Sequence, residues 1–136
     1  MKYKFLDHTA DIMFEAYGSS LNKLFENSGL ATEDTMVNLK QIKPKIKKIV
    51  ELENKDIETL LFDFLCEFIY FKDAELLLFS KIKVKITKGF KLKAELFGDK
   101  LTEKHEQKVD VKAVTFHKFK IEKKDNNYIA RVILDI

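Results

Sequence analysis

Three short groups of residues carry the side-chain types that catalysis or metal binding would need. The first is residues 7–11, DHTAD, which lie between two strand-like segments. The second is residues 104–106, KHE, which lead toward Lys112 and His117, and the third is Asp135-Ile136 at the end of the sequence. Carboxylates are present in all three groups, and histidines occur in the first two.

The histidines give little support to an enzyme. His8, His105 and His117 are candidate zinc ligands, but their spacings of 97 and 12 residues (105 − 8 and 117 − 105) match no compact zinc motif. The sequence also lacks the G-x-S-x-G turn of many hydrolases and the glycine-rich loops that cradle phosphates. Each histidine alone is typical of a hydrogen-bonded structural residue. A small metal-dependent hydrolase that uses all three histidines is the competing interpretation.

Carboxylates at the chain end make a better case for a cation site. The Asp135 side chain is next to the terminal carboxylate of Ile136, and ionising both is unfavourable unless a cation neutralises them. Asp7 or Asp11 can add a third carboxylate from a loop at a strand end. Oxygen ligands without cysteine suit a hard cation such as Ca²⁺ or Mg²⁺. The competing interpretation is a solvated chain end and a turn-forming aspartate.

Composition limits the protein class. The 136 residues, 46% of them hydrophobic, suffice for one core, and we predict a single domain over residues 1–136. The single cysteine, Cys66, excludes a disulfide framework and is typical of a buried thiol in a reducing compartment. No signal-like segment opens the sequence, and the most apolar run, 60–71, is too short for a bilayer. We therefore expect a soluble cytoplasmic protein that does not bind membranes.

Hydrophobic periodicity predicts more strands than helices. Strands are expected near residues 3–7, 12–17, 46–52, 81–86, 91–96, 111–121 and 128–136, with a short extended piece at 36–39. One helix should run from a cap at Ser19 or Ser20 to about Thr32, and a second should follow the N-cap Asp56 for four turns. Strands that are neighbours in sequence favour an α+β fold, in which two α-helices pack on one face of a mostly antiparallel β-sheet.

Positive charge is concentrated in the second half of the chain and comes almost entirely from lysine. Residues 1–68 have a net charge of −3 (9 basic, 12 acidic), and residues 69–136 have +6 (16 basic, 10 acidic). Arg131 is the single arginine, which argues against a dedicated nucleic-acid reader. In the segment 81–86, KIKVKI, lysines face one way and apolar residues the other. This face is either solvated and protects against aggregation, or it contacts RNA or an acidic partner, which makes an RNA-binding module a second competing function.

Several segments, taken in order, resemble the archease family. They are DHTAD at 7–11, the Lys104-His105 pair, VKAVTFH at 111–117, which is similar to the family's VKAxTYH, and the closing VILDI at 132–136. The similarity runs the whole length of the chain and includes the helical segment 60–73. Two departures are visible, because Ile12-Met13 stands where the family often has glycine, and Phe116 replaces the usual tyrosine. Neither departure removes a carboxylate.

The resemblance implies a sheet with two helices and a role without catalysis. Archeases assist the RtcB-type RNA ligase that joins tRNA halves, and they promote its guanylylation by GTP and its multiple turnover. The expected partner is therefore such a ligase, with tRNA contacted only through it. Family members carry a divalent cation, typically calcium, near the chain end. Carried over to this sequence, the ligands are the Asp11 and Asp135 side chains and the Ile136 carboxylate, since the family uses the second Asp of DHTAD. Lys112 and His117 are candidate neighbours of this site, either as contacts for the partner or as structural hydrogen-bonding residues.

Overall fold

The described part of the chain contains seven strands, two α-helices and one short 3-10 helix. The computed structural model describes residues 1–7 and 10–136. In chain order the elements are β1 Tyr3–Leu6, β2 Ile12–Gly18, α1 Leu21–Met36, the 3-10 helix η1 Leu39–Gln41, β3 Ile46–Glu53, α2 Ile57–Glu75, β4 Leu77–Thr87, β5 Lys91–Lys100, β6 Ala113–Lys124 and β7 Asn127–Asp135.

Both helices begin at the residues that their local signals indicate. The Ser20 hydroxyl accepts a hydrogen bond from the Lys23 amide at 3.2 Å, and the Asp56 carboxylate accepts one from the Thr59 amide at 2.9 Å. Each bond satisfies one of the amides that the first turn of a helix leaves without a partner. The predicted caps are therefore confirmed, with Ser20 rather than Ser19 at the start of α1.

The end of α1 differs from the prediction. The helix continues to Met36 instead of stopping near Thr32, and its last turn is largely buried. The segment 36–39, which we expected to be extended, is divided between α1 and η1, and only Val37 makes a strand-like bridge, with Gln107. Burial of this last turn against the core stabilises the longer helix, and this burial cannot be predicted from a local sequence pattern.

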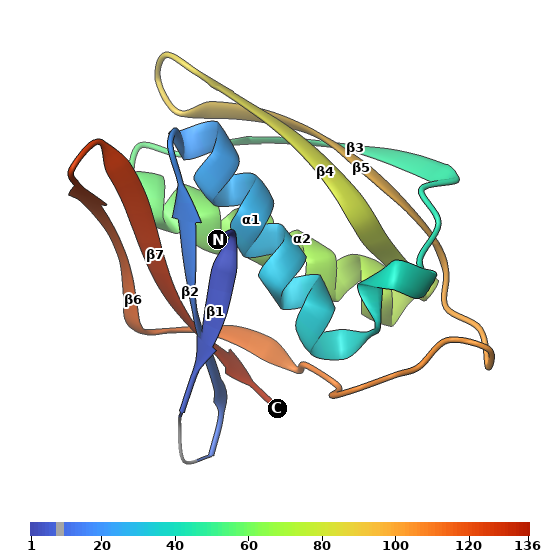
Figure 1. Cartoon of the computed structure of the whole chain (residues 1–136). Coiled ribbons are helices and arrows are strands. Elements are labelled where there is room, and N and C mark those ends of the chain that lie inside the picture. The colour runs from blue at the N-terminus through green and yellow to red at the C-terminus, as the bar shows by residue number, and fades with distance from the viewer. Residues whose placement is uncertain (8–9) are drawn as a thin grey trace.

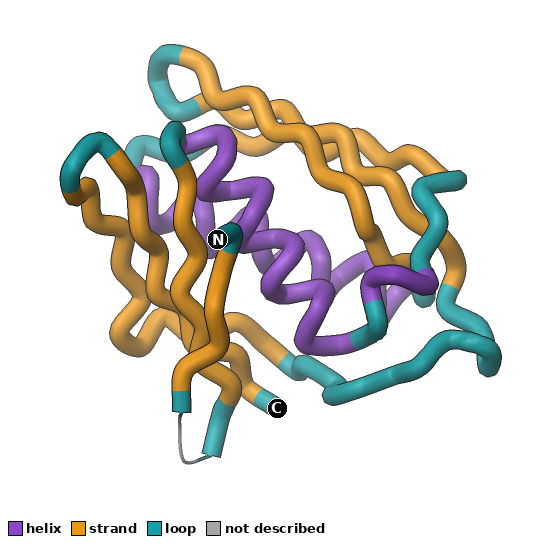
Figure 2. The backbone as a smooth tube through the Cα atoms, in the orientation of Figure 1, coloured by secondary structure: helices purple, strands orange, loops and turns teal. Residues whose placement is uncertain are grey.

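The strands form two antiparallel sheets with the helices between them (Figures 1 and 2). One sheet has the order β1-β2-β7-β6 and the other the order β3-β5-β4. The predicted α+β class, with mostly antiparallel strands and two helices, is confirmed. The expectation that one sheet is covered on one face by both helices is wrong in that detail, because a second sheet covers the other side of the helices. Alternation shows which residues of a strand face a core, but not which strands share a sheet.

Phenylalanine side chains fill the layer between the sheets. The ring centroids of Phe64 and Phe68, both in α2, are 5.0 Å apart. Phe25 of α1 lies 5.9 Å from the Phe64 ring, and Phe79 of β4 lies 6.0 Å from the Phe68 ring. All four side chains are fully buried. The Phe64–Phe68 and Phe68–Phe79 pairs are edge-to-face, a geometry that adds to the free energy gained from apolar burial. No helix in the described part of the chain has both the length and the apolar character required to cross a membrane.

Polar side chains of the helices satisfy amides on the free edges of the sheets. The edge of β4 that is not paired with β5 runs along α1. Three amides of this edge donate hydrogen bonds to side chains of α1: Phe79 to Glu33 (2.7 Å), Val84 to Glu26 (2.9 Å) and Ile86 to Asn22 (2.9 Å). On the other sheet, Glu58 of α2 accepts the Ile121 amide of β6 at 2.8 Å. A buried amide without a partner costs about 1–3 kcal/mol, so these bonds hold each helix against one sheet edge.

Glu33 is fully buried at the contact between α1 and β4. Its Oε2 accepts the Phe79 amide, whereas its Oε1 has no hydrogen-bond partner among the described residues. Loss of hydration raises the pKa of Glu33 well above 4.5, although the Phe79 amide and the charge of Lys72 act in the opposite direction. The folded protein therefore favours the protonated acid.

Replacing Glu33 with glutamine should make stability less sensitive to rising pH. Because the folded pKa of Glu33 is raised, the stability gained from its protonation is present below about pH 4.5 and is lost as the pH rises through the folded pKa. Glutamine keeps an oxygen for the Phe79 amide and does not ionise. The free energy of unfolding in urea, measured from about pH 5 to about pH 9, should fall more steeply for the wild type than for Glu33→Gln. Equal slopes would show that Glu33 does not change its protonation state in this range.

Candidate functional site

The pairing of β2 with β7 brings two of the three expected cation ligands to one end of a sheet. Its antiparallel register sets Ile12 opposite Leu134 and Met13 opposite Ile133. Asp11 directly precedes β2, and Asp135 is the last residue of β7. Asp11 and Asp135 therefore lie at the same end of the β2–β7 pair, each one position beyond the last paired residues.

Both aspartates belong to the sheet face that points away from the helices. Ile12 and Leu134 pack on the core between the sheets. Because successive side chains of a strand alternate between faces, Asp11 and Asp135 share the opposite face with Ile133. Ile133 is only 1% exposed, whereas Asp11 is half-buried and Asp135 is exposed. The two carboxylates therefore lie where an apolar patch on the outer face ends and solvent begins.

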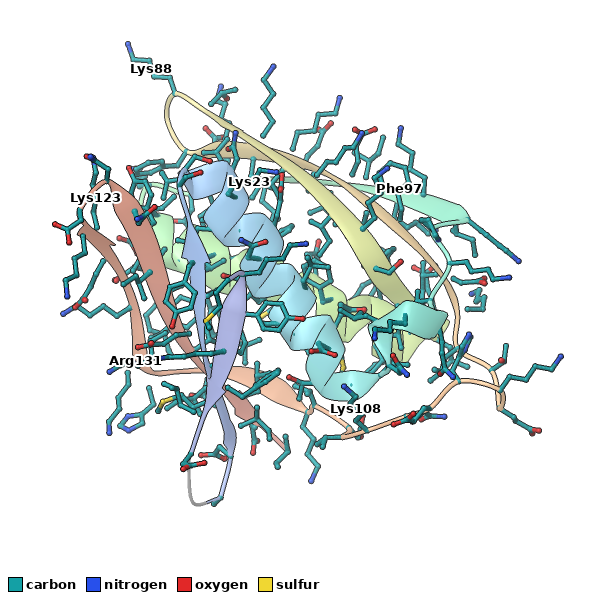
Figure 3. The ribbon with its side chains drawn as sticks, viewed as in Figure 1. Lys23, Lys88, Phe97, Lys108, Lys123 and Arg131 are labelled. Carbon is teal, nitrogen blue, oxygen red and sulfur yellow. The ribbon has the colours of Figure 1, made fainter. Side chains whose placement is uncertain are left out.

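An ion pair joins β2 and β7 on the same face as the aspartates. Arg131 of β7, labelled in Figure 3, donates a hydrogen bond to Glu15 of β2 at 2.6 Å, and the two residues are directly paired. The bond from Arg131 is the main cause of a lowered pKa at Glu15. A slip of one residue would send the two charges to opposite faces and would separate Asp11 from Asp135. The single arginine of the sequence thus has a structural role on this face.

The chain end lies beside β6 and a lysine. The Lys112 amide donates to the Asp135 carbonyl at 2.8 Å, and Ala113 pairs with Asp135 in the β6–β7 register. Continued by one position, this register sets Lys112 beside Ile136, which is 38% exposed. Lys112 is therefore a neighbour of the chain end through its main chain, and the role of its side chain stays a prediction.

Lys72 of α2 holds the segment that carries Lys112. Its ammonium donates to Asp110, to the Val111 carbonyl at 2.8 Å, and to Asp73 at 3.0 Å. Burial alone would lower the pKa of Lys72, but its hydrogen bonds to Asp110 and Asp73 outweigh that effect and raise it. The same contact lowers the pKa of Asp110. The lysine therefore stays charged and attaches the start of β6 to the end of α2.

The expected cation ligands stay a prediction. In residues 1–7 and 10–136, no group of three His, Cys, Asp or Glu side chains is arranged to hold a metal ion. The predicted set has two aspartate side chains and one main-chain carboxylate, so it does not require such a group. Asp7, the alternative aspartate, is exposed after the end of β1.

The three histidines do not form a site within the described residues. His8 lies outside them, together with Thr9. His105 closes a turn after β5, where its Nδ1 accepts the Thr102 amide at 2.9 Å. His117 is exposed in the irregular part of β6 between Thr115 and Lys120. The turn gives His105 the hydrogen-bonded structural role that we considered for each histidine.

A groove next to Lys112 was not predicted. It has a volume of about 540 Å³ and lies between α2 and the start of β6. Phe62, Cys66 and Tyr70 contribute one wall from α2, and Tyr70 is 56% exposed. These three residues recur every four positions, which is the signal that could have identified the groove. The structure leaves this side of α2 partly open.

Comparison with known proteins agrees with this fold over its whole length. The model of the archease protein family matches residues 3–136. The chain is 44% identical to the protein archease of Thermococcus kodakarensis over 99% of both chains, and 42% identical to that of Archaeoglobus fulgidus over 100% of both.

Two solved structures share the arrangement of strands and helices. The solution structure of Methanobacterium thermoautotrophicum protein 1598 has a TM-score of 0.89 and 40% identity over 99% of both chains. The crystal structure of a Thermotoga maritima archease, described as a possible chaperone, has a TM-score of 0.67 over 98% of this chain and 96% of that one. At 24% identity the second likeness concerns the fold alone. With the family model matched almost from end to end, this chain belongs to the archease family.

Proposed function

We propose that this protein is an accessory protein, without catalysis of its own, that binds and activates an RtcB-type tRNA-splicing RNA ligase in the cytoplasm. Membership of the archease family supports an accessory role. In this proposal the protein promotes guanylylation of the ligase by GTP and its multiple turnover, and it reaches tRNA through the ligase. The observation that carries the proposal is the position of Asp11 and Asp135 at an open sheet end, where a second protein has access to them.

The proposed site holds a divalent cation, with Ca²⁺ as the best match. Its ligands are the Asp11 and Asp135 side chains and the Ile136 carboxylate. The cross-strand register of the two aspartates and the position of Ile136 one residue further on support this set. Carboxylate oxygens favour hard cations, and three anionic ligands gain most from a doubly charged ion. A bound cation supplies positive charge that can be presented to phosphate groups at the nucleotide site of the ligase.

The proposal predicts activity only together with the ligase. Alone, the protein should neither join RNA nor hydrolyse GTP. Added to the cognate ligase, it should raise the rate at which guanylylated ligase forms from labelled GTP, and the number of RNA joints made per ligase. Ligase guanylylated in advance is the control, because its first ligation should proceed without help. If the protein accelerates that first ligation as much as it accelerates guanylylation, the proposed step is wrong.

Single substitutions test the two aspartates. Asp11→Asn and Asp135→Asn keep the side-chain shape and remove one anionic ligand each, so each should weaken calcium binding by about tenfold or more. At saturating calcium, a tenfold loss removes about 1.4 kcal/mol of calcium-dependent stabilisation. Calorimetric titration and melting temperature with and without calcium measure the effect. Asp7→Asn is the matched control and should bind calcium normally; a loss in this variant alone would assign the ligand to Asp7.

The chain end has its own test. Amidation of the Ile136 carboxylate removes its charge and adds almost no bulk, so it should reduce the stabilisation by calcium and the activation of the ligase. A peptide tag after Ile136 should act in the same direction, whereas a tag before Met1 should have little effect. The melting temperatures of the free acid and the amide are compared with and without calcium. Equal shifts and equal activation would show that Ile136 is only the end of a strand.

A further inference from the structure

An aromatic ring surrounded by lysines occupies the outer face of the β3–β5–β4 sheet. Phe97 belongs to the central strand, and Lys47 of β3 and Lys81 of β4 are its cross-strand partners. The Nζ atoms of Lys47, Lys81 and Lys83 lie 5.9, 5.4 and 6.0 Å from the centroid of the Phe97 ring. We call these four residues the Phe97 cluster. Figure 3 shows Phe97 on one side of the molecule and Lys123, at the end of β6, on the other.

Two of the three ammonium groups form no ion pair within the described residues, although Lys83 lies directly opposite Glu95 on β5. Lys47 pairs with Glu95 at 2.5 Å. Among the described residues, no acidic group forms an ion pair with Lys81 or Lys83, and both lysines are exposed. Contact with the ring face gives each only about 0.5–1 kcal/mol at an exposed site. Like charges gathered at one ring repel one another, so an anion that binds there relieves an existing cost.

Further charged residues lie around the Phe97 cluster on the same outer face. The same outer face continues along β4 and β5 with Lys85, Lys91 and Lys93, and its acidic residues are Glu51, Glu53, Glu95 and Asp99. The side chain of Ile49, opposite Glu95 on β3, is 53% exposed. The free positive charge is therefore concentrated next to Phe97 and Ile49, where the face also offers apolar surface.

We propose that the Phe97 cluster binds single-stranded RNA, with one base stacked on the Phe97 ring and the flanking phosphates held by Lys81 and Lys83. Aromatic rings beside cations on a sheet surface form the platform on which unpaired bases stack. A duplex hides the faces of its bases, whereas RNA presents unpaired bases in loops and at ends. An acidic peptide would satisfy the lysines but has no planar group for the ring. This contact goes beyond the proposed function, in which RNA is reached only through the ligase.

The two sites lie on different sheets. The carboxylate site is at the end of the β2–β7 pair, and the Phe97 cluster is on the sheet at the far side of the helices. A polyanion is attracted to the second site and repelled by the first when no cation is bound there. RNA bound to the Phe97 cluster would therefore leave the carboxylates accessible to a protein partner.

Fluorescence anisotropy with a labelled 12-nucleotide RNA of mixed sequence, titrated with the whole protein alone, tests the proposal. For single strands, the logarithm of the binding constant falls with the logarithm of the salt concentration, with a slope of about 0.7 per phosphate contact. Replacing both Lys81 and Lys83 with alanine should therefore lower the slope by about 1.4 and weaken binding at low salt. Phe97→Leu should weaken binding by about tenfold because it keeps apolar bulk and loses the ring, and Phe97→Trp should restore it. Melting temperatures of the variants show that each one is folded.

The matched control removes two lysines from the other sheet. Lys123→Ala combined with Lys124→Ala lowers the net charge by the same amount at the β6–β7 turn, where Lys123 also lies against a ring, that of Tyr128, at 5.6 Å. This variant should bind RNA like the wild type. An equal loss in both double variants would show that binding follows net charge alone and would overturn the proposal.

Competition experiments separate the other classes of ligand. Unlabelled duplex RNA and an acidic peptide should compete poorly, and single-stranded DNA of the same sequence reports whether the 2′-hydroxyl contributes. Duplex RNA or the peptide competing as well as the single strand would overturn the stacking arrangement. So would a Phe97→Leu variant that binds like the wild type, or Lys81 and Lys83 substitutions that change solubility but not RNA binding.

Discussion

Amides at the free edge of β4 need hydrogen-bond partners inside the protein, and three side chains of α1 supply them. This requirement determines how the layers are assembled. An edge strand left open would be a template for pairing with another chain, and a buried open edge would lose its hydrogen bonds to water. Because Glu33 serves one of these amides, a carboxyl group is kept in the core with a strongly raised pKa. Glu58 serves β6 in the same way, so each helix is attached to an edge of a different sheet.

This arrangement places the helices between the sheets, so the outer face of each sheet points away from them. On one of these faces, the Glu15–Arg131 pair joins β2 and β7, whose shared end carries Asp11 and Asp135, and Lys72 attaches the segment before β6 to α2. On the outer face of the other sheet, the Lys81 ammonium lies over the Phe97 ring. Lys112 meets the β2–β7 end of the first sheet through a main-chain hydrogen bond to Asp135.

Local patterns in the sequence were sufficient for the class of the fold. Strict alternation in 81–86 identifies a half-buried strand, and Lys81, Lys83 and Lys85 are indeed exposed while Ile82 and Val84 are buried. The caps at Ser20 and Asp56 were readable because a side-chain oxygen three residues before an amide is a local event. Motifs in order across the whole chain were sufficient for the family. These features depend on contacts within a few residues or on the order of motifs.

Tertiary structure alone decided the remaining features. Two sheets instead of one, the extra turn of α1 and the groove beside Phe62 and Tyr70 arise from contacts between residues far apart in sequence. The burial of Glu33 and Lys72 depends likewise on which element packs above them, since a charged residue on a helix usually faces water. The residues alone left Asp7 and Asp11 open, and the resemblance to the archease family favoured Asp11, but the placement of Asp11 and Asp135 at one end of two paired strands follows from a register. A register is set by pairing energies summed along both strands, so no single segment contains it.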